Sequence, residues 1–173
     1  MKPRAFKDID WTRWRPRERA TLLFVLRGGR ILLIHKKKGL GAGKLNGPGG
    51  RLEPGETPRQ AAIREVQEEL HITPTGVKPA GELQFQFTNG HSIHAYVFTA
   101  AGFRGRPQET DEAIPLWFPR DEIPYQRMWA DDRVWLPLLL AGQPFIGRFL
   151  FDEDQMMGCD ITRRRAAAHT IWK

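Results

Sequence analysis

Glu65, Glu68 and Glu69 place three carboxylates close together in the sequence. At the 3.6-residue period of an α-helix, their side chains fall within about 100° of one another. Like charges at this spacing destabilise a solvated helix by about 0.3 kcal/mol per pair. Such a cluster of hard oxygen ligands suits Mg²⁺ or Mn²⁺, which keep several waters and bind substrate phosphates. Helix geometry alone leaves two interpretations open, a divalent metal site and a solvated acidic face.

The helix that carries these glutamates is predicted over Thr57–His71. Thr57 is an N-cap candidate, Pro58 suits the first helical position, and Gln60 completes a capping box. A different side of the helix is apolar and can face a core, through Ala62, Ile63, Val66 and Leu70.

The spacing around this helix resembles the Nudix box, G-x5-E-x7-R-E-U-x-E-E-x-G-U, in which U is aliphatic. Residues Gly50–Ile72 read GRLEPGETPRQAAIREVQEELHI and fit every named position except the last glycine, which is His71. That glycine would end the helix in a left-handed conformation, which histidine adopts at a cost of about 1 kcal/mol. The resemblance implies an α+β fold, a Nudix-type α/β/α sandwich with a mixed central sheet and the Nudix loop and helix.

The same resemblance implies roles for the acidic residues. Glu65, Glu68 and Glu69 would hold Mg²⁺, with Mn²⁺ as a substitute, together with the Gly49 carbonyl and with Glu112 from a separate loop. These four glutamates are the expected catalytic residues, and Glu69 or Glu112 would take the proton of the attacking water. Glu112 also has a plain interpretation as an exposed surface carboxylate.

Several other charged residues flank the box. Glu56 and Arg64 are expected to form a structural ion pair that braces the loop against the helix. Lys36 and, more weakly, Arg51 are expected to face the phosphates. The other lysines of this stretch fit a solvated loop equally well.

Two further segments resemble the oxidised-purine branch of the family, the 8-oxo-dGTP diphosphatases of the human type. They are KKKGLGAGKLNGPGG at Lys36–Gly50 and DEIPYQRMWADDRVWLPLLL at Asp121–Leu140. The likeness implies a base pocket in which Asn46 reads a purine edge, while Phe85 and Trp129 stack on the base. Phe85 fits a buried core equally well. The other substrate-binding residues that the resemblance implies are Thr21, Pro48, Gly49, Gly50, Arg51, Ala130, Asp131 and Asp132.

Asp131 and Asp132 have two interpretations. Either residue could simply cap a helix, which aspartate does well. If both are buried, one carboxyl can keep a proton and donate while the other accepts, which would match the edge of an oxidised guanine or adenine. Leu40 and Leu45 stand where this branch has a phenylalanine and a tryptophan, so the packing around the base is expected to differ.

The whole chain has 173 residues and a net charge of +7, which suits one basic domain with a phosphate-rich substrate. Its single cysteine excludes an internal disulfide and a multi-cysteine zinc site. No apolar run approaches the length of about 18 residues of a membrane span, and no hydrophobic signal segment is present. We therefore expect a cytoplasmic monomer that acts on a nucleotide and contacts no membrane.

Residues 1–18 are predicted to be a basic extension of the single Nudix domain, 19–173. Trp11 and Trp14 lie among arginines, which fits a strap packed on the domain or an arm that binds nucleic acid. The arm would favour an alternative Nudix activity on RNA 5′ ends or on other nucleoside diphosphate derivatives. A non-catalytic Nudix module that only binds nucleotide or nucleic acid is a third hypothesis, against which the intact box glutamates argue.

The elements that position these residues are predicted as a mixed sheet flanked by helices. A hairpin turns at Gly28-Gly29 and a second one at Asn89-Gly90. The predicted strands are Ala20–Arg27, Arg30–His35, Gly81–Thr88, His91–Ala100, Ile114–Phe118 and Phe145–Phe151, and a second helix covers Asp131–Leu140.

Overall fold

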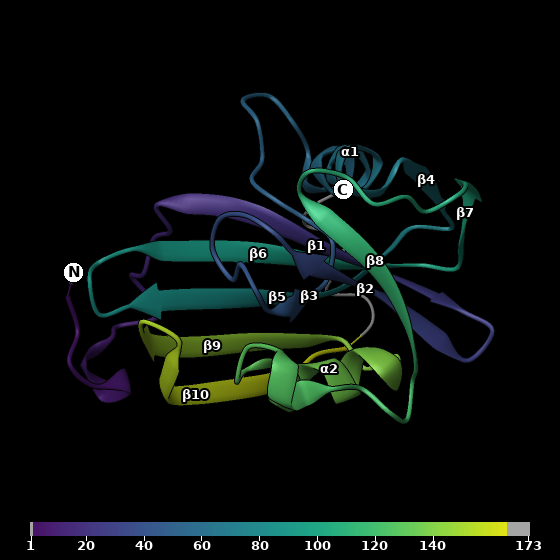
Figure 1. Cartoon of the computed structure of the whole chain (residues 1–173). Coiled ribbons are helices and arrows are strands. Elements are labelled where there is room, and N and C mark those ends of the chain that lie inside the picture. The colour runs from purple at the N-terminus through teal and green to yellow at the C-terminus, as the bar shows by residue number, and fades with distance from the viewer. Residues whose placement is uncertain (1, 166–173) are drawn as a thin grey trace.

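In the computed structural model, which describes residues 2–165, a mixed sheet lies between two helices (Figure 1). The helices are α1 (Pro58–Leu70) and α2 (Asp132–Leu140), with short 3₁₀ turns η1 (Phe6–Asp8) and η2 (Tyr125–Arg127). The strands are β1 (Glu18–Arg27), β2 (Arg30–Lys36), β3 (Leu45–Asn46), β4 (Ile72–Thr75), β5 (Lys78–Phe87), β6 (Ser92–Ala100), β7 (Gly102–Gly105), β8 (Ala113–Pro119), β9 (Phe145–Asp152) and β10 (Gln155–Arg163). Within residues 2–165, no helix is long and apolar enough to cross a membrane.

The main sheet has eight strands in the order β10-β9-β5-β6-β1-β2-β3, and β8 pairs with β2 beside this path. Strand β1 runs parallel to β6, and β5 runs parallel to β9, whereas the other neighbours are antiparallel. Strands β4 and β7 form a separate two-stranded sheet. The predicted mixed sheet is therefore confirmed.

Each face of the sheet has its own hydrophobic core. Successive side chains of a strand point to opposite faces, so Leu23 and Val25 of β1 pack with α1, while Phe24 packs with α2. Trp135 of α2 is fully buried, with its ring centroid 5.7 Å from that of Phe24. The predicted α/β/α sandwich is confirmed by this two-sided packing (Figure 1).

Helix α1 begins and ends as its sequence predicts. The Thr57 hydroxyl accepts from the Gln60 amide at 3.2 Å, and the Gln60 side chain accepts from the Thr57 amide at 2.9 Å, which completes the capping box. At the other end His71 adopts the left-handed conformation, with φ 58° and ψ 30°. The helix therefore ends where the Nudix pattern has glycine, although the side chain is histidine.

Replacing His71 with glycine is expected to raise the free energy of unfolding by about 1 kcal/mol, because glycine adopts positive φ without steric penalty. The His71 ring is exposed, and its Nδ1 lies 3.4 Å from Gln108 Oε1, so little packing is lost. Urea unfolding of the two proteins measures the difference. His71→Ala serves as the control, and a His71→Gly protein no more stable than His71→Ala would contradict the argument.

An N-terminal strap, residues 3–17, packs along the sheet beside β9 and β10. Ile9 and Trp14 are buried and form a small separate core with Leu150 of β9. The indole of Trp14 is only 5% exposed, so it cannot stack on a nucleic acid. The structure thus favours the packed strap over the nucleic-acid arm. Residues 166–173 of the predicted domain lie outside the described residues.

Candidate active site

The loop before α1 is held in place by main-chain bonds to β1. The amide of Thr21 donates to the Gly50 carbonyl and that of Leu23 to the Pro48 carbonyl, both at 2.8 Å. A Cβ on Gly49 would stand 1.9 Å from the Thr21 carbonyl oxygen, so only glycine permits this approach. The close contact fixes the loop against the sheet and turns it toward α1.

Arg64 braces the same loop from α1. Its Nε lies 2.6 Å from one oxygen of Glu56, and its Nη2 lies 2.9 Å from the other. The Arg64 hydrogen bond is the main reason that the pKa of Glu56 falls to about 2. Nη2 also donates to the Arg51 carbonyl at 3.0 Å. The Glu56–Arg64 ion pair expected from the sequence is present in the structure.

Glu69 points from α1 into the molecule and is only 2% exposed. Its Oε1 accepts from the Gly49 amide at 2.8 Å. Burial raises the pKa of Glu69 to about 8, and the negative charges of Glu65 and Glu112 act in the same direction, against the positive charge of Lys36. A carboxyl with a pKa near neutrality can exchange a proton at working pH.

Glu65 and Glu68 share one partner. Arg64 Nη1 lies 2.9 Å from Glu65 and 3.2 Å from Glu68. The Glu65 carboxylate is pressed against the loop, since a Cβ on Gly50 would stand 2.4 Å from its Cδ. Burial raises the pKa of Glu65, and the charges of Glu68 and Glu112 add to this effect.

The fit of these residues to a divalent cation rests on their chemistry. Within residues 2–165, no group of three or more His, Cys, Asp or Glu side chains is arranged to hold a metal ion. The donors on α1 are nevertheless all carboxylate oxygens, the ligands that Mg²⁺ prefers. The negative charge of Glu112 raises the pKa of both Glu65 and Glu69, and the charge of Glu65 raises that of Glu69 further, so a bound cation would relieve this repulsion. The chemistry of these residues therefore fits a hard divalent cation.

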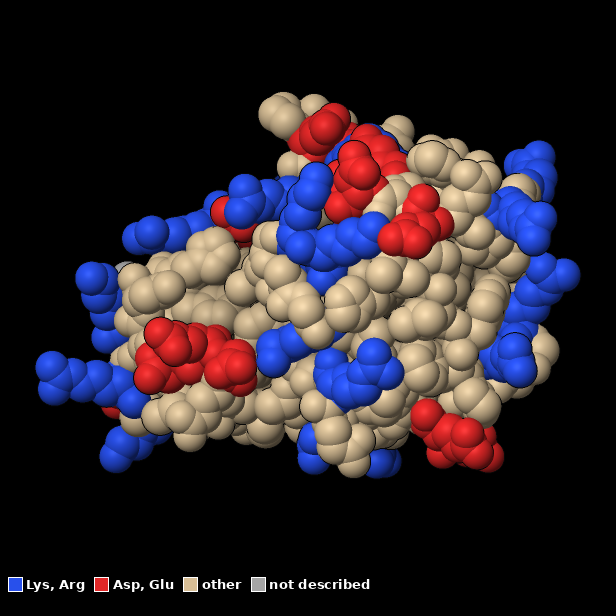
Figure 2. Space-filling view, viewed as in Figure 1, with Lys and Arg blue, Asp and Glu red and all other residues tan. Residues whose placement is uncertain are grey.

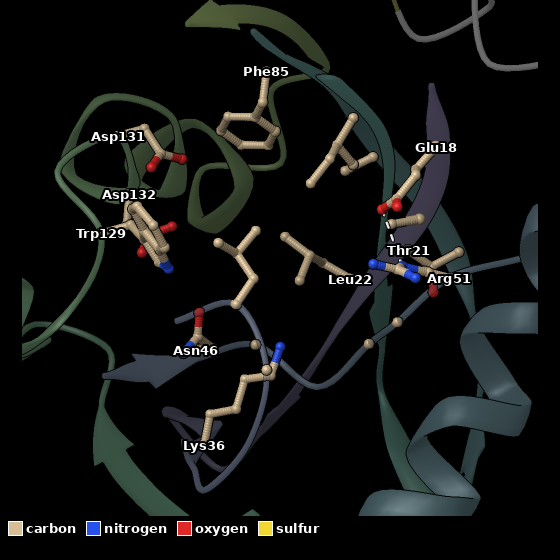
Figure 3. Close-up of a pocket in the computed structure, with 18 of the residues that line it drawn as sticks. Glu18, Thr21, Leu22, Lys36, Asn46, Arg51, Phe85, Trp129, Asp131 and Asp132 are labelled. Carbon is tan, nitrogen blue, oxygen red and sulfur yellow. Dashed lines mark ion pairs between the residues drawn. The ribbon is translucent and has the colours of Figure 1, made fainter. Parts of the chain in front are cut away.

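A cavity of about 410 Å³ opens next to Glu69, a size typical of small-molecule sites (Figure 3). Three neighbouring strands, β5, β6 and β1, form its floor. Strands β5 and β6 contribute every second residue, whereas β1 contributes three consecutive residues, Ala20, Thr21 and Leu22. The residues that line it are Glu18, Ala20, Thr21, Leu22, Ile34, Lys36, Gly39, Leu40, Asn46, Gly47, Gly49, Gly50, Arg51, Glu69, Phe85, Phe87, His91, Ile93, Ala95, Trp129, Asp131, Asp132 and Phe151.

Aromatic and amide side chains form one end of this cavity. Trp129 packs edge-on against Phe151, with ring centroids 5.4 Å apart, and the Lys44 ammonium lies 5.4 Å from the Trp129 ring. Asn46 donates through Nδ2 to the carbonyls of Gly41 and Lys44, at 3.4 and 3.2 Å. Its Oδ1 is left to point toward the cavity, where it can accept a hydrogen bond (Figure 3).

Asp131 and Asp132 lie beside Trp129 and are 3% and 7% exposed. Asp131 does not cap α2 with its side chain, but accepts from Trp135 Nε1 at 2.8 Å. Burial raises the pKa of Asp131 to about 6, although the Trp135 bond opposes it. Burial and the charge of Asp131 raise the pKa of Asp132 well above its usual range. The simple capping interpretation is therefore wrong for Asp131, and the pair holds a proton more firmly than ordinary aspartates.

This burial predicts how stability changes with pH. Because the pKa of Asp131 rises from 3.8 to about 6 on folding, unfolding releases protons, and the free energy of unfolding falls as pH rises through this window. Asp131→Asn removes the buried charge and can still accept from Trp135. We expect it to match the wild type at pH 4 and to exceed its stability at pH 8 by on the order of 2 kcal/mol.

Urea unfolding at pH 4, 6 and 8 measures this difference. Asp121→Asn, at an exposed aspartate, is the matched control and should follow the wild type at every pH. Equal stabilities of Asp131→Asn and wild type at pH 8 would contradict a buried charge at this position.

Polar groups also line the other end of the cavity. The Thr21 side chain is 1% exposed, and its Oγ1 has no hydrogen-bond partner. At the rim, Glu18 pairs with Arg51 Nε at 3.0 Å and lies 3.7 Å from His91 Nε2.

The structure brings most of the predicted substrate-binding residues together. Thr21, Lys36, Asn46, Gly49, Gly50, Arg51, Phe85, Trp129, Asp131 and Asp132 all line the cavity. Pro48 and Ala130 do not: Pro48 is buried and uses its carbonyl to bond β1, and Ala130 packs against the α2-side core. Glu65, Glu68 and Glu112 also lie outside the cavity lining, although Glu69 belongs to it.

Other lining residues were not predicted from the sequence as site residues. Glu18, Phe87, His91 and Phe151 come from distant parts of the chain. The alternation of β5, which puts Phe87 on the same face as Phe85, was the one signal that could have indicated Phe87. No local pattern singles out Glu18 or Phe151.

Comparison with known proteins decides the family. A family model described as the NUDIX domain matches residues 16–139. The chain belongs to the Nudix family. It is 44% identical over 132 residues to the oxidized purine nucleoside triphosphate hydrolase of Danio rerio, covering 76% of this chain and 85% of the relative. It is 39% identical over 143 residues to the protein of the same name from Mus musculus, covering 82% of this chain and 92% of the relative.

A solved Nudix structure supports the fold. The MutT protein from Bacillus halodurans superposes with a TM-score of 0.74 at 22% identity, covering 83% of this chain and 97% of the other. The sequence motif, the sandwich and the family match agree, so the chain is a Nudix hydrolase, as its box predicts.

Proposed function

We propose that this Nudix hydrolase cleaves oxidised purine nucleoside triphosphates to the monophosphate and pyrophosphate. The proposed substrates are 8-oxo-dGTP and, second, 2-oxo-dATP, and the proposed cofactor is Mg²⁺, with Mn²⁺ as a substitute. The observation that carries this proposal is the buried pair Asp131 and Asp132, which lines the cavity beside Trp129. The names of the relatives from Danio rerio and Mus musculus support it.

The proposed recognition follows from the chemistry of this cavity end. Oxidation of guanine turns the N7 acceptor into an N–H donor and adds a carbonyl at C8. A carboxyl that keeps its proton can donate to a purine carbonyl, and a neighbouring carboxylate can accept from an N–H. Asn46 adds an acceptor, and Phe85 and Trp129 offer aromatic surface to the base. The aspartate pair thus provides both a donor and an acceptor.

The proposed cleavage takes place next to Glu69. The residues that would hold Mg²⁺ are Glu65, Glu68, Glu69, Glu112 and the Gly49 carbonyl. When bound, the ion would neutralise phosphate charge and lower the pKa of a water molecule bound to it. Lys36 lines the cavity near Glu69 and attracts the phosphates. Glu69 is buried and Glu112 is exposed, and either carboxylate could accept the proton of the attacking water.

A panel of nucleotides tests the proposal. The protein is incubated with Mg²⁺ and 8-oxo-dGTP, 2-oxo-dATP, dGTP or dATP, and monophosphate and pyrophosphate are followed separately. We expect kcat/KM for 8-oxo-dGTP to exceed that for dGTP by at least about tenfold, since one mismatched buried hydrogen bond costs about 1–3 kcal/mol. Equal values for oxidised and normal nucleotides, or release of phosphate alone, would contradict the proposal.

The two alternative hypotheses find less support. A strap that buries Trp14 cannot offer this indole to an RNA chain. On the face in Figure 2, Lys and Arg side chains lie in several groups that other residues separate. A module that only binds nucleotides would have no need of a buried Glu69 with a raised pKa. Triphosphorylated RNA added to the panel is expected to be a poor substrate.

A further inference from the structure

We propose that the N-terminal strap positions one wall of the nucleotide cavity through hydrogen bonds that run from Trp14 to Gln86 and on to the β5–β6 turn. This inference rests on the proposed function, because the wall matters only if the cavity binds a nucleotide. It makes Trp14 and Gln86 positioning residues, since neither lines the cavity.

The strap is firmly seated on the sheet. Ile9 and Trp14 pack on Leu150 of β9. Phe6 rests on Gly158 of β10, where a Cβ would stand 2.6 Å from the Phe6 Cβ. A glycine at this place lets the strap lie close to the strand, so Trp14 is held in a fixed position against the sheet.

The buried amide of Gln86 links the strap to the turn. Trp14 Nε1 donates to Gln86 Oε1 at 2.9 Å. Gln86 Nε2 in turn donates to the carbonyls of Phe87 and His91, both at 3.0 Å. Gln86 is 2% exposed, and a buried amide that lost one of these partners would leave a polar group unsatisfied. The three bonds therefore support one another and fix the turn to the strap.

The same turn forms part of the cavity on its other side. Strand alternation points Gln86 to the strap and its neighbours Phe85 and Phe87 to the cavity, which His91 also lines. The turn is closed by main-chain bonds from the Phe87 amide to the His91 carbonyl at 2.9 Å and from the Gly90 amide to the Phe87 carbonyl at 3.0 Å. Loss of the Gln86 bonds would loosen the wall that Phe87 and His91 present to the ligand.

A matched pair of variants tests this link. Trp14→Phe keeps an aromatic ring in the strap and removes the donor to Gln86. Trp11→Phe makes the same change three residues earlier, where the buried Nε1 has no hydrogen-bond partner. Two properties are measured in the full chain: amide hydrogen exchange over residues 87–92, and KM and kcat for 8-oxo-dGTP with Mg²⁺.

We expect Trp14→Phe to speed exchange in the turn about fivefold and to raise KM about fivefold, with kcat within twofold of wild type. These changes correspond to the loss of one buried hydrogen bond. Trp11→Phe should leave both unchanged. If the strap only adds stability, Trp14→Phe would lower the melting temperature without altering KM or the exchange rate of the turn, and that result would overturn the inference.

A second variant guards against a folding defect. Gln86→Met keeps the side-chain length and removes all three bonds, so it should reproduce the Trp14→Phe result. Because exchange needs no substrate, unchanged exchange in both variants overturns the link even if 8-oxo-dGTP proves not to be the substrate. Faster exchange with unchanged KM, in a protein that does hydrolyse 8-oxo-dGTP, overturns the positioning role alone.

Discussion

Glu69→Gln is expected to lower kcat by about 10³-fold, which is within the range of general-base removal. Glutamine keeps the length of the side chain, and its Oε1 can still accept from the Gly49 amide that now bonds Glu69 at 2.8 Å. It cannot accept a proton from water, and it is a poorer ligand for a divalent cation. Because a buried charge is removed, the variant should unfold at the same urea concentration as the wild type or a higher one.

The control for this variant is Glu53→Gln, which alters an exposed glutamate of the loop before α1, 3.9 Å from Arg64. Its kcat should stay within twofold of the wild type. Single-turnover rates with 8-oxo-dGTP at pH 8 give the comparison directly. A Glu69→Gln protein that keeps more than about a tenth of the wild-type rate would exclude Glu69 as the general base and direct attention to Glu112.

Asp132→Ala is expected to lower kcat/KM for 8-oxo-dGTP by about 100-fold and for dGTP by less than about tenfold. The buried Asp132 carboxyl has no counterpart in alanine, so the polar edge of the oxidised base would be left unpaired, at a cost of about 1–3 kcal/mol. Asp131→Asn should also lower the ratio of kcat/KM for 8-oxo-dGTP to kcat/KM for dGTP, because an amide cannot exchange a proton with the neighbouring Asp132 carboxyl. The ratio of the two kcat/KM values is the decisive quantity.

The exposed aspartate before η2 provides a control, since Asp121→Ala should leave both substrates unaffected. If neither substitution at 131 or 132 alters the ratio, the aspartate pair has no part in reading the base. The proposed preference for oxidised purines would then have to come from Asn46 or from the aromatic surfaces.

The parts of the structure that the sequence predicts well are those fixed by neighbours in the chain. The cap at Thr57, the end of α1 at His71 and the Glu56–Arg64 pair all depend on residues within two helical turns or one short loop. The strands of the two strongest hairpins are also confirmed within a few residues, because their apolar runs are long and their turns contain glycine.

Four strands were missed for physical reasons. Strand β3 has two residues, β4 contains Pro74, and β7 contains two glycines, so none shows a strand pattern. Strand β10 is largely exposed and exists because β9 offers it an antiparallel edge. The predicted second helix is confirmed although Pro137 lies inside it, because packing of Trp135 and Leu136 outweighs the cost of the proline.

The cavity itself depends on contacts that no local pattern encodes. Glu18, His91 and Phe151 meet there only because β1 pairs with β6 and β5 pairs with β9. The strap's buried bond from Trp14 to Gln86 likewise joins residues on separate elements. Sequence reasoning could name the residue types that the site requires, and tertiary pairing decides which distant side chains complete it.

The parallel pairing of β5 with β9 has a consequence for how the protein folds. These strands are far apart in the chain, and closing so long a loop is slow, so β9 is expected to dock after the nearby hairpins have formed. Phe151 arrives with it, and the base end of the cavity is therefore assembled last. A bound nucleotide would then retard unfolding while leaving the refolding rate nearly untouched, because its contacts form after the rate-limiting step.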